Sequence, residues 1–357
     1  MLNNDFTTYG MVYFTDTVSG GRSSVYSNTY VVSLPGRDYI IDTSCGRKRL
    51  AELTEHFRGR DNYTILCTHY HNDHIANNGR MAGAGRKIIY HENAKKKVSY
   101  LRTNGTGQIL RMYRDMQKEG FLKRLGFFDD LFIRLLLRRK IYSKIIAEPL
   151  LFMIAYLVSL KTIGRIYSGK RHVNYLEKPD RISLPLNGLD AAGWRIDDGL
   201  YALEAPGHTD CHIIFYAQKS KILLAGDALN FLTPNDIQFG ELHSTIATQK
   251  FLLELAIKEK IEILCQGHYP PITGNEAVIN HITEIIEKHE YVHSRLSSYV
   301  KEKSHGLSFD ELYAQICTID DPVIKKLARI TFPRSTLVFL DVYLLKVIEE
   351  AGKESRM

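Results

Sequence analysis

Three histidines and an aspartate lie within a stretch of six residues: His69, His71, Asp73 and His74. They follow the apolar run Thr64–Cys67, which has the composition of a buried strand. Imidazole nitrogens and carboxylate oxygens are together suited to a borderline metal ion such as zinc. His69 and His71 are two residues apart and point to the same side of an extended chain, whereas Asp73 and His74 can follow around a turn into a helix. One short loop can therefore serve two adjacent metal ions.

Three later segments each place one candidate ligand directly after a glycine: Gly207–His208, Gly226–Asp227 and Gly267–His268. Each follows an apolar run of the strand type, and a glycine lets the backbone turn at the end of a strand. With these, the chain offers seven candidate ligands, five histidines and two aspartates. An isolated pair of histidines is a weak signal, but seven donors that all follow apolar runs favour metal binding over coincidence.

The order of these motifs resembles that of a known family. HxHxDH at 69–74, GHT at 207–209, GDA at 226–228 and GH at 267–268 are similar to the motifs of the metallo-β-lactamase superfamily. The resemblance covers residues 10–95 and 180–290 and leaves out the central part and the C-terminal part of the chain. It implies an α/β fold, a four-layer αβ/βα sandwich with two metal ions at the edges of its sheets.

The resemblance also implies a role for each candidate ligand. It implies three ligands of a first metal ion: His69, His71 and His208. It implies three ligands of a second metal ion: Asp73, His74 and His268. Asp227 is implied to be the carboxylate that bridges the two ions. Zinc is the expected metal, and iron and manganese also suit five imidazoles and two carboxylates.

Two positions narrow the resemblance to particular branches. Aspartate rather than cysteine at 227, together with His74, is similar to the glyoxalase II, lactonase and nuclease branches. The flavodiiron oxidases of the superfamily carry glutamate where this chain has His71, so oxygen reduction is not expected. The expected protein is a hydrolase with two metal ions, of the glyoxalase II-like branch.

The expected reaction follows from such a metal pair. A water that bridges two divalent ions is deprotonated near neutral pH, and the bridging hydroxide attacks the substrate. Asp73 is the candidate to orient this nucleophile and to pass its proton to the leaving group. We expect hydrolysis of an ester, thioester or lactone, with a phosphodiesterase or nuclease as the alternative. A membrane-associated or partner-binding protein that keeps the metals only for structure is a third hypothesis.

Other residues near the motifs leave their roles open. Asp42 and Thr209 each have two interpretations, support of a ligand histidine or an ordinary turn residue. Cys211 is expected to be a small buried residue rather than a reactive thiol. Three histidines on a long helix are expected to be solvated: His281, His289 and His293.

The pattern of apolar residues predicts the elements that must position these side chains. Strands are expected at 25–34, 39–42, 63–68, 199–204, 213–216, 222–225 and 261–266. Helices are expected at 244–260, 276–301 and 335–350, the last one ending before Gly352. The predicted organisation is a first half of the core at 1–110, an insert at 111–171, a second half at 172–300 and a helical C-terminal extension at 301–357.

Composition excludes several classes of protein. The 357 residues carry a net charge of +7 and are 44% apolar, as in globular domains rather than disordered or collagen-like chains. The five cysteines are scattered without a CxxC pair, which argues against a disulfide framework. The longest apolar run, Pro149–Leu160, is too short to span a bilayer as a helix, and the N-terminus does not resemble a secretory signal. A cytoplasmic location is expected.

The insert at 111–171 differs from the rest in charge. It holds 14 Lys and Arg against five Asp and Glu, so its charge of +9 exceeds that of the whole chain. It also contains two apolar stretches. We favour a lid that lines a pocket for the apolar part of a small-molecule substrate. Peripheral contact with an anionic membrane comes second, and a grip on phosphate-rich substrates third.

The C-terminal extension carries no basic face. From residue 308 onward, seven Lys and Arg stand against eight Asp and Glu. DNA binding is therefore not expected, because a phosphate-binding face is basic. Packing on the core, capping of the pocket and formation of a homodimer are the expected roles.

Overall fold

The computed structural model describes residues 2–15, 27–83, 86–95, 172–230, 242–303 and short pieces between 311 and 348. The predicted insert at 111–171 lies outside the described residues, and so do the predictions of a lid or a membrane contact. Everything below concerns the described part of the chain.

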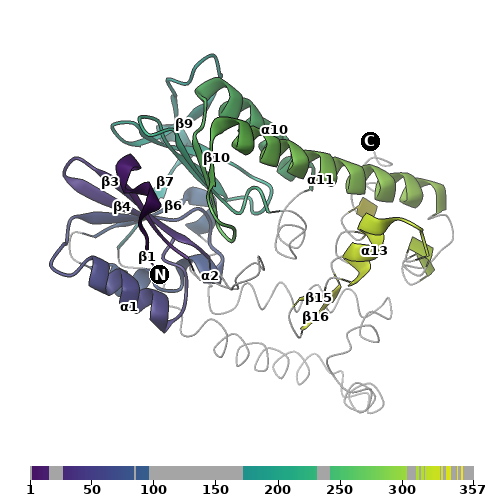
Figure 1. Cartoon of the computed structure of the whole chain (residues 1–357), viewed down its shortest axis with the longest axis horizontal. Helices are drawn as coiled ribbons and strands as arrows, with labels where there is room; N and C mark the ends of the chain where they lie inside the picture. Colours follow the sequence, from purple (N-terminus) through teal and green to yellow (C-terminus); the bar gives the residue numbers. More distant parts are fainter. Residues whose placement is uncertain are drawn as a thin grey trace, which may run out of the picture.

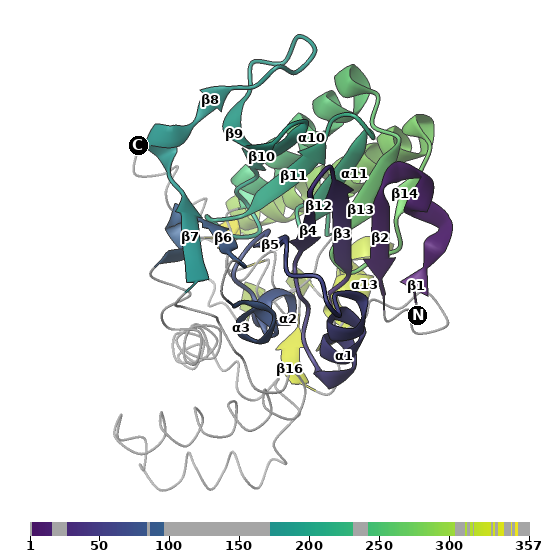
Figure 2. The same ribbon diagram turned by 90° about the vertical axis from the view of Figure 1, so that its left-hand side faces the viewer.

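Two seven-stranded sheets form the centre of the protein (Figures 1 and 2). The first sheet contains, in spatial order, β1 (Leu2–Asn3), β2 (Met11–Phe14), β3 (Thr29–Leu34), β4 (Arg37–Ile41), β5 (Tyr63–Leu66), β6 (Ile88–His91) and β7 (Val173–Leu176). The second sheet contains, in spatial order, β14 (Ile272–Thr273), β13 (Ile263–Gln266), β12 (Ile222–Gly226), β11 (Ile213–Ala217), β10 (Leu200–Glu204), β9 (Ala192–Asp197) and β8 (Ile182–Ser183). β4 to β7 are parallel to one another, as are β12 and β13.

Helices lie on the outer face of each sheet (Figure 2). The first sheet carries α1 (Arg47–His56), α2 (Asn72–Ile75) and α3 (Asn78–Met81), and the second carries α10 (Leu242–Glu259) and α11 (Asn275–Lys303). The described 3-10 helices are η1 (Asn4–Tyr9), η2 (Glu92–Ala94) and η5 (Lys178–Asp180). The expected helices at 244–260 and 276–301 are confirmed within a few residues.

Alternation of side chains along each strand separates the core into layers. In β3, Tyr30 and Val32 contact the second sheet, whereas Val31 packs with the helices of the first. In β11, Phe215 lies between the sheets and Tyr216 packs under the helices of the second. The strands are thus apolar on both faces, because each sheet is covered on both sides. This is the predicted four-layer αβ/βα sandwich.

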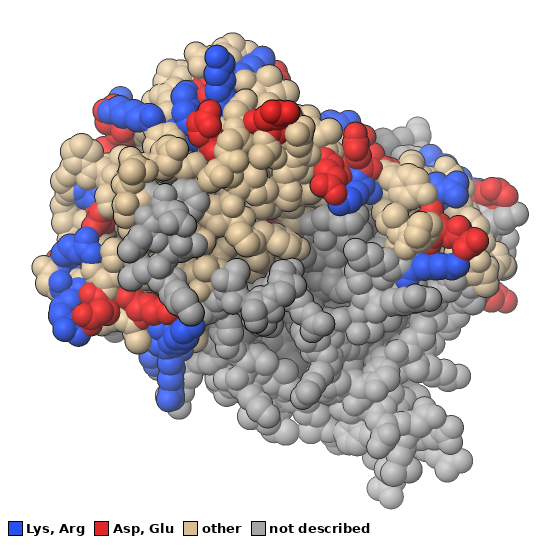
Figure 3. All heavy atoms as spheres, viewed as in Figure 1, with Lys and Arg blue, Asp and Glu red and all other residues tan. Residues whose placement is uncertain are grey.

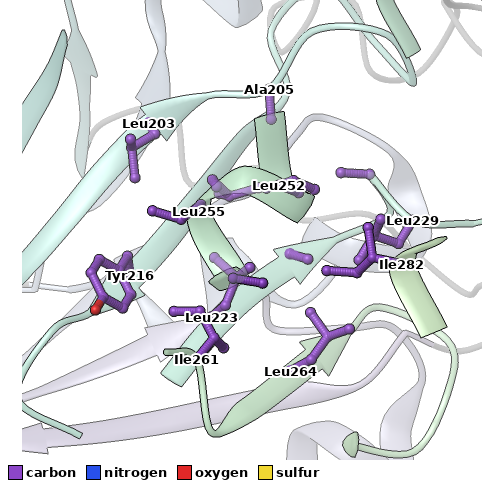
Figure 4. Close-up of a cluster of buried hydrophobic side chains, with 14 of the residues drawn as sticks. Leu203, Ala205, Tyr216, Leu223, Leu229, Leu252, Leu255, Ile261, Leu264 and Ile282 are labelled. Atoms are coloured by element: carbon purple, nitrogen blue, oxygen red, sulfur yellow. The ribbon is translucent and has the colours of Figure 1, made fainter. Parts of the chain in front are cut away.

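The outer layer of the second sheet is made by α10 and α11. In Figure 4, Leu252 and Leu255 of α10 and Ile282 of α11 lie over Leu223 of β12 and Leu264 of β13. All five side chains are essentially inaccessible to solvent. The two long helices are therefore fixed to the sheet whose strand ends carry Asp227 and His268.

The predicted exposure of the α11 histidines is wrong for His289. Its side chain is 1% exposed and its Nδ1 lies 2.8 Å from Oε1 of Gln249 on α10. His281 is half-buried and lies 3.2 Å from Oε1 of Gln266. His289 lies three residues after Ile286 and three before Val292, so helical spacing places it on the apolar stripe of α11.

The C-terminal extension is not purely helical. It contains the helix α13 (Pro322–Arg329) and a hairpin of β15 (Thr331–Phe332) and β16 (Ser335–Val338). The prediction of a helix from residue 335 is therefore wrong at its start. The β-branched residues Thr336 and Val338 favour a strand there, an effect that helical spacing alone does not register.

Charged residues of both signs share the described surface. Figure 3 shows Lys and Arg interspersed with Asp and Glu on this face, and α11 carries ion pairs such as Lys288–Glu284. The four described cysteines are buried. Within the described residues, no helix combines the length and the apolar content that crossing a membrane requires.

Candidate metal centre

The candidate ligands follow the carboxyl ends of four strands and meet at one edge of the sandwich. β5 leads into the segment with His69, β10 into His208, β12 into Asp227 and β13 into His268. Several hydrogen bonds join the sheets at this edge, of which two illustrate the connection. The amide of Ile213 donates to the carbonyl of Thr68 at 2.8 Å, and the hydroxyl of Tyr30 donates to the carbonyl of Gln266 at 2.6 Å.

Two of the glycines before the ligands are required by close approach. Gly226 has a φ of +51°, and a Cβ there would lie 2.8 Å from Cβ of Thr68. A Cβ at Gly267 would lie 2.0 Å from Oδ1 of Asp227. Any side chain at either position would push the ligand segments apart.

Three histidines, which we call the nitrogen group, converge on one point: His69, His71 and His208. Nε2 of His208 lies 3.2 Å from Nε2 of His69 and 3.0 Å from Nδ1 of His71. All three side chains are buried. Ligands about 2 Å from a tetrahedral zinc ion are separated by about 3.3 Å, so these spacings fit one ion.

Three residues on the other side, which we call the mixed group, converge in the same way: Asp73, His74 and His268. Oδ2 of Asp73 lies 3.2 Å from Nε2 of His268 and 3.7 Å from Nε2 of His74. Both histidines come from segments that the sequence places far apart, and the fold brings them together. The two groups contain the six non-bridging ligands that the resemblance implied.

Asp227 lies between the two groups. Its Oδ2 is 3.3 Å from Nε2 of His74 and 3.4 Å from that of His268. The same atom is 3.5 Å from Nε2 of His208 and 4.0 Å from that of His69. Within the described residues, neither carboxylate oxygen has a hydrogen bond of good geometry, although the side chain is fully buried. A buried carboxylate needs hydrogen bonds or positive charge to offset the loss of water, and a pair of divalent ions fits this position.

The surroundings keep the imidazoles of the nitrogen group neutral and the carboxylate of Asp227 negatively charged. Burial, with help from the neighbouring imidazoles, holds the pKa of His69 and His71 well below the usual value. Both rings are therefore neutral and offer a lone pair. Burial alone would raise the pKa of Asp227, but His74 and His268 outweigh it and hold that pKa well below its usual value.

In the mixed group, carboxylates and histidines stabilise one another. Burial alone would lower the pKa of both histidines, but Asp227 and Asp73 outweigh it and raise the pKa of His268 to about 10. Asp227, Asp73 and Asp42 likewise raise the pKa of His74 above the usual value. Burial opposes the charge of Asp73, yet His74 and His268 lower its pKa to about 2. Protons occupy the histidine sites that a divalent ion would compete for.

Asp42, at the end of β4, supports ligands of both groups. Its Oδ2 accepts from Nδ1 of His74 at 2.8 Å and from the hydroxyl of Thr68 at 2.7 Å. The hydroxyl of Thr68 in turn lies 3.0 Å from Nδ1 of His69. Both rings thereby direct Nε2 into the site, as hydrogen-bonded ligand histidines commonly do. Of the two interpretations of Asp42, support of a ligand histidine is the one observed.

The turn interpretation holds for Thr209. Its carbonyl accepts from the amides of Gly207 and His212, each at 3.3 Å, and its hydroxyl lies 3.3 Å from the sulfur of Cys211. Cys211 is buried, as expected of a small core residue. These residues shape the loop that carries His208.

Sequence reasoning missed His212. This histidine is 1% exposed, and its ring stacks on that of His69 with centroids 5.1 Å apart. Its Nε2 accepts from the amide of Asp227 at 3.1 Å. Burial holds its pKa well below the usual value. The one local signal was a histidine directly before the apolar strand β11, while its partners come from other strands.

The comparisons with known proteins agree with this arrangement. The sequence model described as Metallo-beta-lactamase superfamily matches residues 23–129 and 131–268. The chain belongs to the metallo-β-lactamase superfamily. Members of this superfamily are typically metal-dependent hydrolases that bind divalent ions, usually zinc. The match includes most of the insert at 111–171, which the motifs alone had left outside the resemblance. No curated protein matches the chain.

Solved structures with the same fold include two that cover most of the chain. A metallo-β-lactamase family protein from Thermus thermophilus has 21% identity and a TM-score of 0.53, over 97% of this chain and 94% of that one. A stereoselective inverting sec-alkylsulfatase from a Pseudomonas species has 14% identity and a TM-score of 0.53, over 91% of this chain and 47% of that one. At such low identity, these likenesses establish the superfamily fold.

Proposed function

We propose that this metallo-β-lactamase superfamily protein is a hydrolase with two metal ions that cleaves an ester, thioester or lactone bond. The observation that carries the proposal is the position of Oδ2 of Asp227, within 4.0 Å of Nε2 atoms from both donor groups. A single metal site would not place one buried carboxylate against histidines of two separate groups. Asp227 is therefore assigned as the bridging ligand.

The remaining ligands are assigned from the same geometry. The nitrogen group would hold one ion and the mixed group the other. Five imidazoles favour zinc among the biological divalent ions. The ions, when bound, would supply an activated water and polarise the oxygen of the scissile bond.

Asp73 is the proposed proton carrier. Its side chain is 14% exposed, whereas that of Asp227 is 1% exposed. Asp73 is therefore the more solvent-accessible of the two carboxylates, and Asp227 is enclosed by the candidate ligands. His74 and His268 lower the pKa of Asp73 and keep it ionised, so its carboxylate can accept a hydrogen bond from a water and orient it. Transfer of the proton from this water to the leaving group is the further role that we propose for Asp73.

The charge distribution supports a carbonyl substrate over a nucleic acid. The chain outside the insert carries a net charge of −2, since the insert holds +9 of the total of +7. The excess positive charge that could bind a phosphodiester lies in the insert. For this reason phosphodiesterase activity is the second candidate. We propose the glyoxalase II-like branch, with the apolar part of the substrate under the insert as a lid.

A panel of substrates tests the proposal. Zinc-loaded protein is assayed with a glutathione thioester, an acyl-CoA thioester, a lactone, an aryl ester, bis-nitrophenyl phosphate and, because of the alkylsulfatase neighbour, a secondary alkyl sulfate. Turnover of a carbonyl ester that Asp227→Ala abolishes and Asp198→Asn keeps would support the proposal, since Asp198 is an exposed carboxylate paired with Lys219. Cleavage of the phosphodiester alone would establish the second candidate, and loaded protein without any turnover would contradict both.

A further inference from the structure

We infer that His212 is a positioning residue of the metal centre. Its imidazole fixes Asp227 by a hydrogen bond and packs against the rings of His69 and His208. The inference rests on the proposed function, because it takes these three residues as metal ligands. It goes further, because it states that a residue outside the ligand set affects how tightly one of the two donor groups binds its ion.

The hydrogen bond defines the direction in which Asp227 leaves its strand. Nε2 of His212 accepts from the amide of Asp227 at 3.1 Å. Gly226 precedes Asp227 with a φ of +51°, and a Cβ on it would lie 2.9 Å from Nε2 of His212. The backbone of this turn therefore lies against the imidazole, and the bond fixes the amide from which the Asp227 side chain departs.

The same ring lies against two ligands of the nitrogen group. It stacks on His69 with an interplanar angle of 29° and centroids 5.1 Å apart. It meets the ring of His208 edge-on, with centroids 5.7 Å apart. These two contacts limit how far either ligand ring can tilt away from the metal position.

The backbone of His212 completes the connection. Its amide donates to the carbonyl of Thr209 at 3.3 Å, and its carbonyl accepts from the amide of Ala205 at 2.9 Å. These bonds close the loop that carries His208 at the start of β11. Segments from β5, β10 and β12 thus meet at one imidazole.

Stability alone does not account for an imidazole at this position. Because Nε2 accepts a hydrogen bond, the ring hydrogen is on Nδ1, and Nδ1 has no hydrogen-bond partner within the described residues. A buried donor without a partner costs free energy that an apolar side chain of similar size would not. What the imidazole supplies, and an apolar residue does not, is the acceptor for Asp227.

The contacts of His212 are unequally divided between the two groups. Its hydrogen bonds and ring contacts, as far as the described residues show, reach His69, His208 and Asp227 but neither Asp73 nor His268. Loss of the imidazole removes the ring contacts with His69 and His208 together with the acceptor for Asp227, and should therefore weaken the ion of the nitrogen group more than the ion of the mixed group.

Two variants of similar shape test this inference. His212→Gln keeps an acceptor at about the position of Nε2, and His212→Met does not. Each is titrated with cobalt(II), followed by its absorption spectrum, and with zinc against a competing chelator. We expect one of two ions to bind about 10- to 100-fold more weakly to His212→Met, with a changed cobalt spectrum, and His212→Gln to restore most of the loss. His289→Gln, at a buried histidine of the helix layer, is the control.

Three results would overturn the inference. One is that the methionine and glutamine variants both bind like the wild type, and another is that both weaken the two ions equally without rescue. If His212→Met fails to fold, nitrogen NMR of wild-type imidazoles decides, because a hydrogen found on Nε2 of His212 excludes the proposed bond. A wild type that binds two ions without hydrolysing any substrate would contradict the proposed function and leave this comparison intact.

Discussion

The nitrogen group and the mixed group flank the same carboxylate, Asp227, but their buried side chains differ in charge. In the nitrogen group, burial lowers the pKa of His69 and His71 and leaves neutral rings. In the mixed group, carboxylates raise the pKa of His74 and His268, so charge is balanced by charge. An ion in the nitrogen group would meet neutral imidazoles, whereas an ion in the mixed group would compete with protons for His74 and His268.

The support behind the two groups differs as well. Asp42 bonds directly to His74 of the mixed group and reaches His69 of the nitrogen group only through the hydroxyl of Thr68. Behind the nitrogen group, the ring of His212 adds a second brace. Under the proposed assignment, the two ions would be held by different supporting contacts, so each could be weakened separately.

Removal of one ligand from each group is the strongest test of this comparison. His71→Ala and His268→Ala should each lower kcat/KM for the best substrate by about 10³-fold, since each of the proposed ions would supply several kcal/mol to the transition state. Metal analysis should show that each variant retains one ion. His243→Ala, at an exposed position of α10, is the control. A ligand variant whose kcat/KM stays within tenfold of the wild-type value would contradict the assignment of one ion to each group.

His289 lies outside both groups, so a variant at this position shows how much of the stability lost in acid comes from the helix layer rather than from the metal centre. Burial lowers its pKa from 6.5 to about 4, so the unfolded chain binds a proton at higher pH than the folded chain does. Stability from the neutral ring is complete above the unfolded pKa and is lost as the pH falls toward the folded pKa. The loss is on the order of 3 kcal/mol.

Urea unfolding of metal-free protein at neutral pH and at a pH between these two values measures the effect. His289→Gln, which can still donate to Gln249, should lose less stability over this interval than the wild type. Equal losses in the two proteins would show that acid acts through other groups, those of the metal centre included.

Asp42→Asn tests the support that both groups share. Asparagine tolerates the φ of +54° at this position but removes the charge that holds the ligand rings. Zinc affinity should fall about 10- to 100-fold, with both ions affected. Asp38→Asn, a change at a partly exposed position of the same strand, should leave the affinity unchanged. An effect confined to one ion would mean that Thr68 does not transmit the support.

Thr68→Val gives the smallest effect and the sharpest distinction. Valine keeps the shape of threonine but removes the hydroxyl between Asp42 and His69, a loss of about one net hydrogen bond. The ion of the nitrogen group should bind less than about tenfold more weakly, and the ion of the mixed group should be unaffected. Thr64→Val, at a buried position of β5, is the matched control. Chelator competition that finds the larger loss in the mixed group would reverse the proposed order of support.

The seven candidate ligands and a layered α/β fold were predicted from local patterns in the sequence, and the four-layer arrangement from the family resemblance. A histidine or aspartate after an apolar run and a glycine marks the end of a strand, and parallel strands bring such ends together. The choice for Asp42 could not be made locally, because its partners Thr68 and His74 follow a neighbouring strand. Pairing of β4 with β5 decides it.

Residues whose roles depend on contacts between distant strands were missed or misjudged. His212 acquires its role from Asp227 and His69, which come from two other strands. For His289 the signal was present, since its spacing from Ile286 places it on the apolar stripe of α11. Short edge strands such as β1 and β8 have only two residues each and carry too little pattern to predict.

The role of Asp227 as the bridge between two ions is tested by counting metal ions in the wild type and in Asp227→Asn, after zinc loading and removal of free metal. Native mass spectrometry gives the number of ions in each folded chain. We expect two ions in the wild type and in the control Asp198→Asn, and at most one in Asp227→Asn. A wild type that holds a single ion, or an Asp227→Asn variant that still holds two, would contradict the assignment of Asp227 as the bridge between two groups.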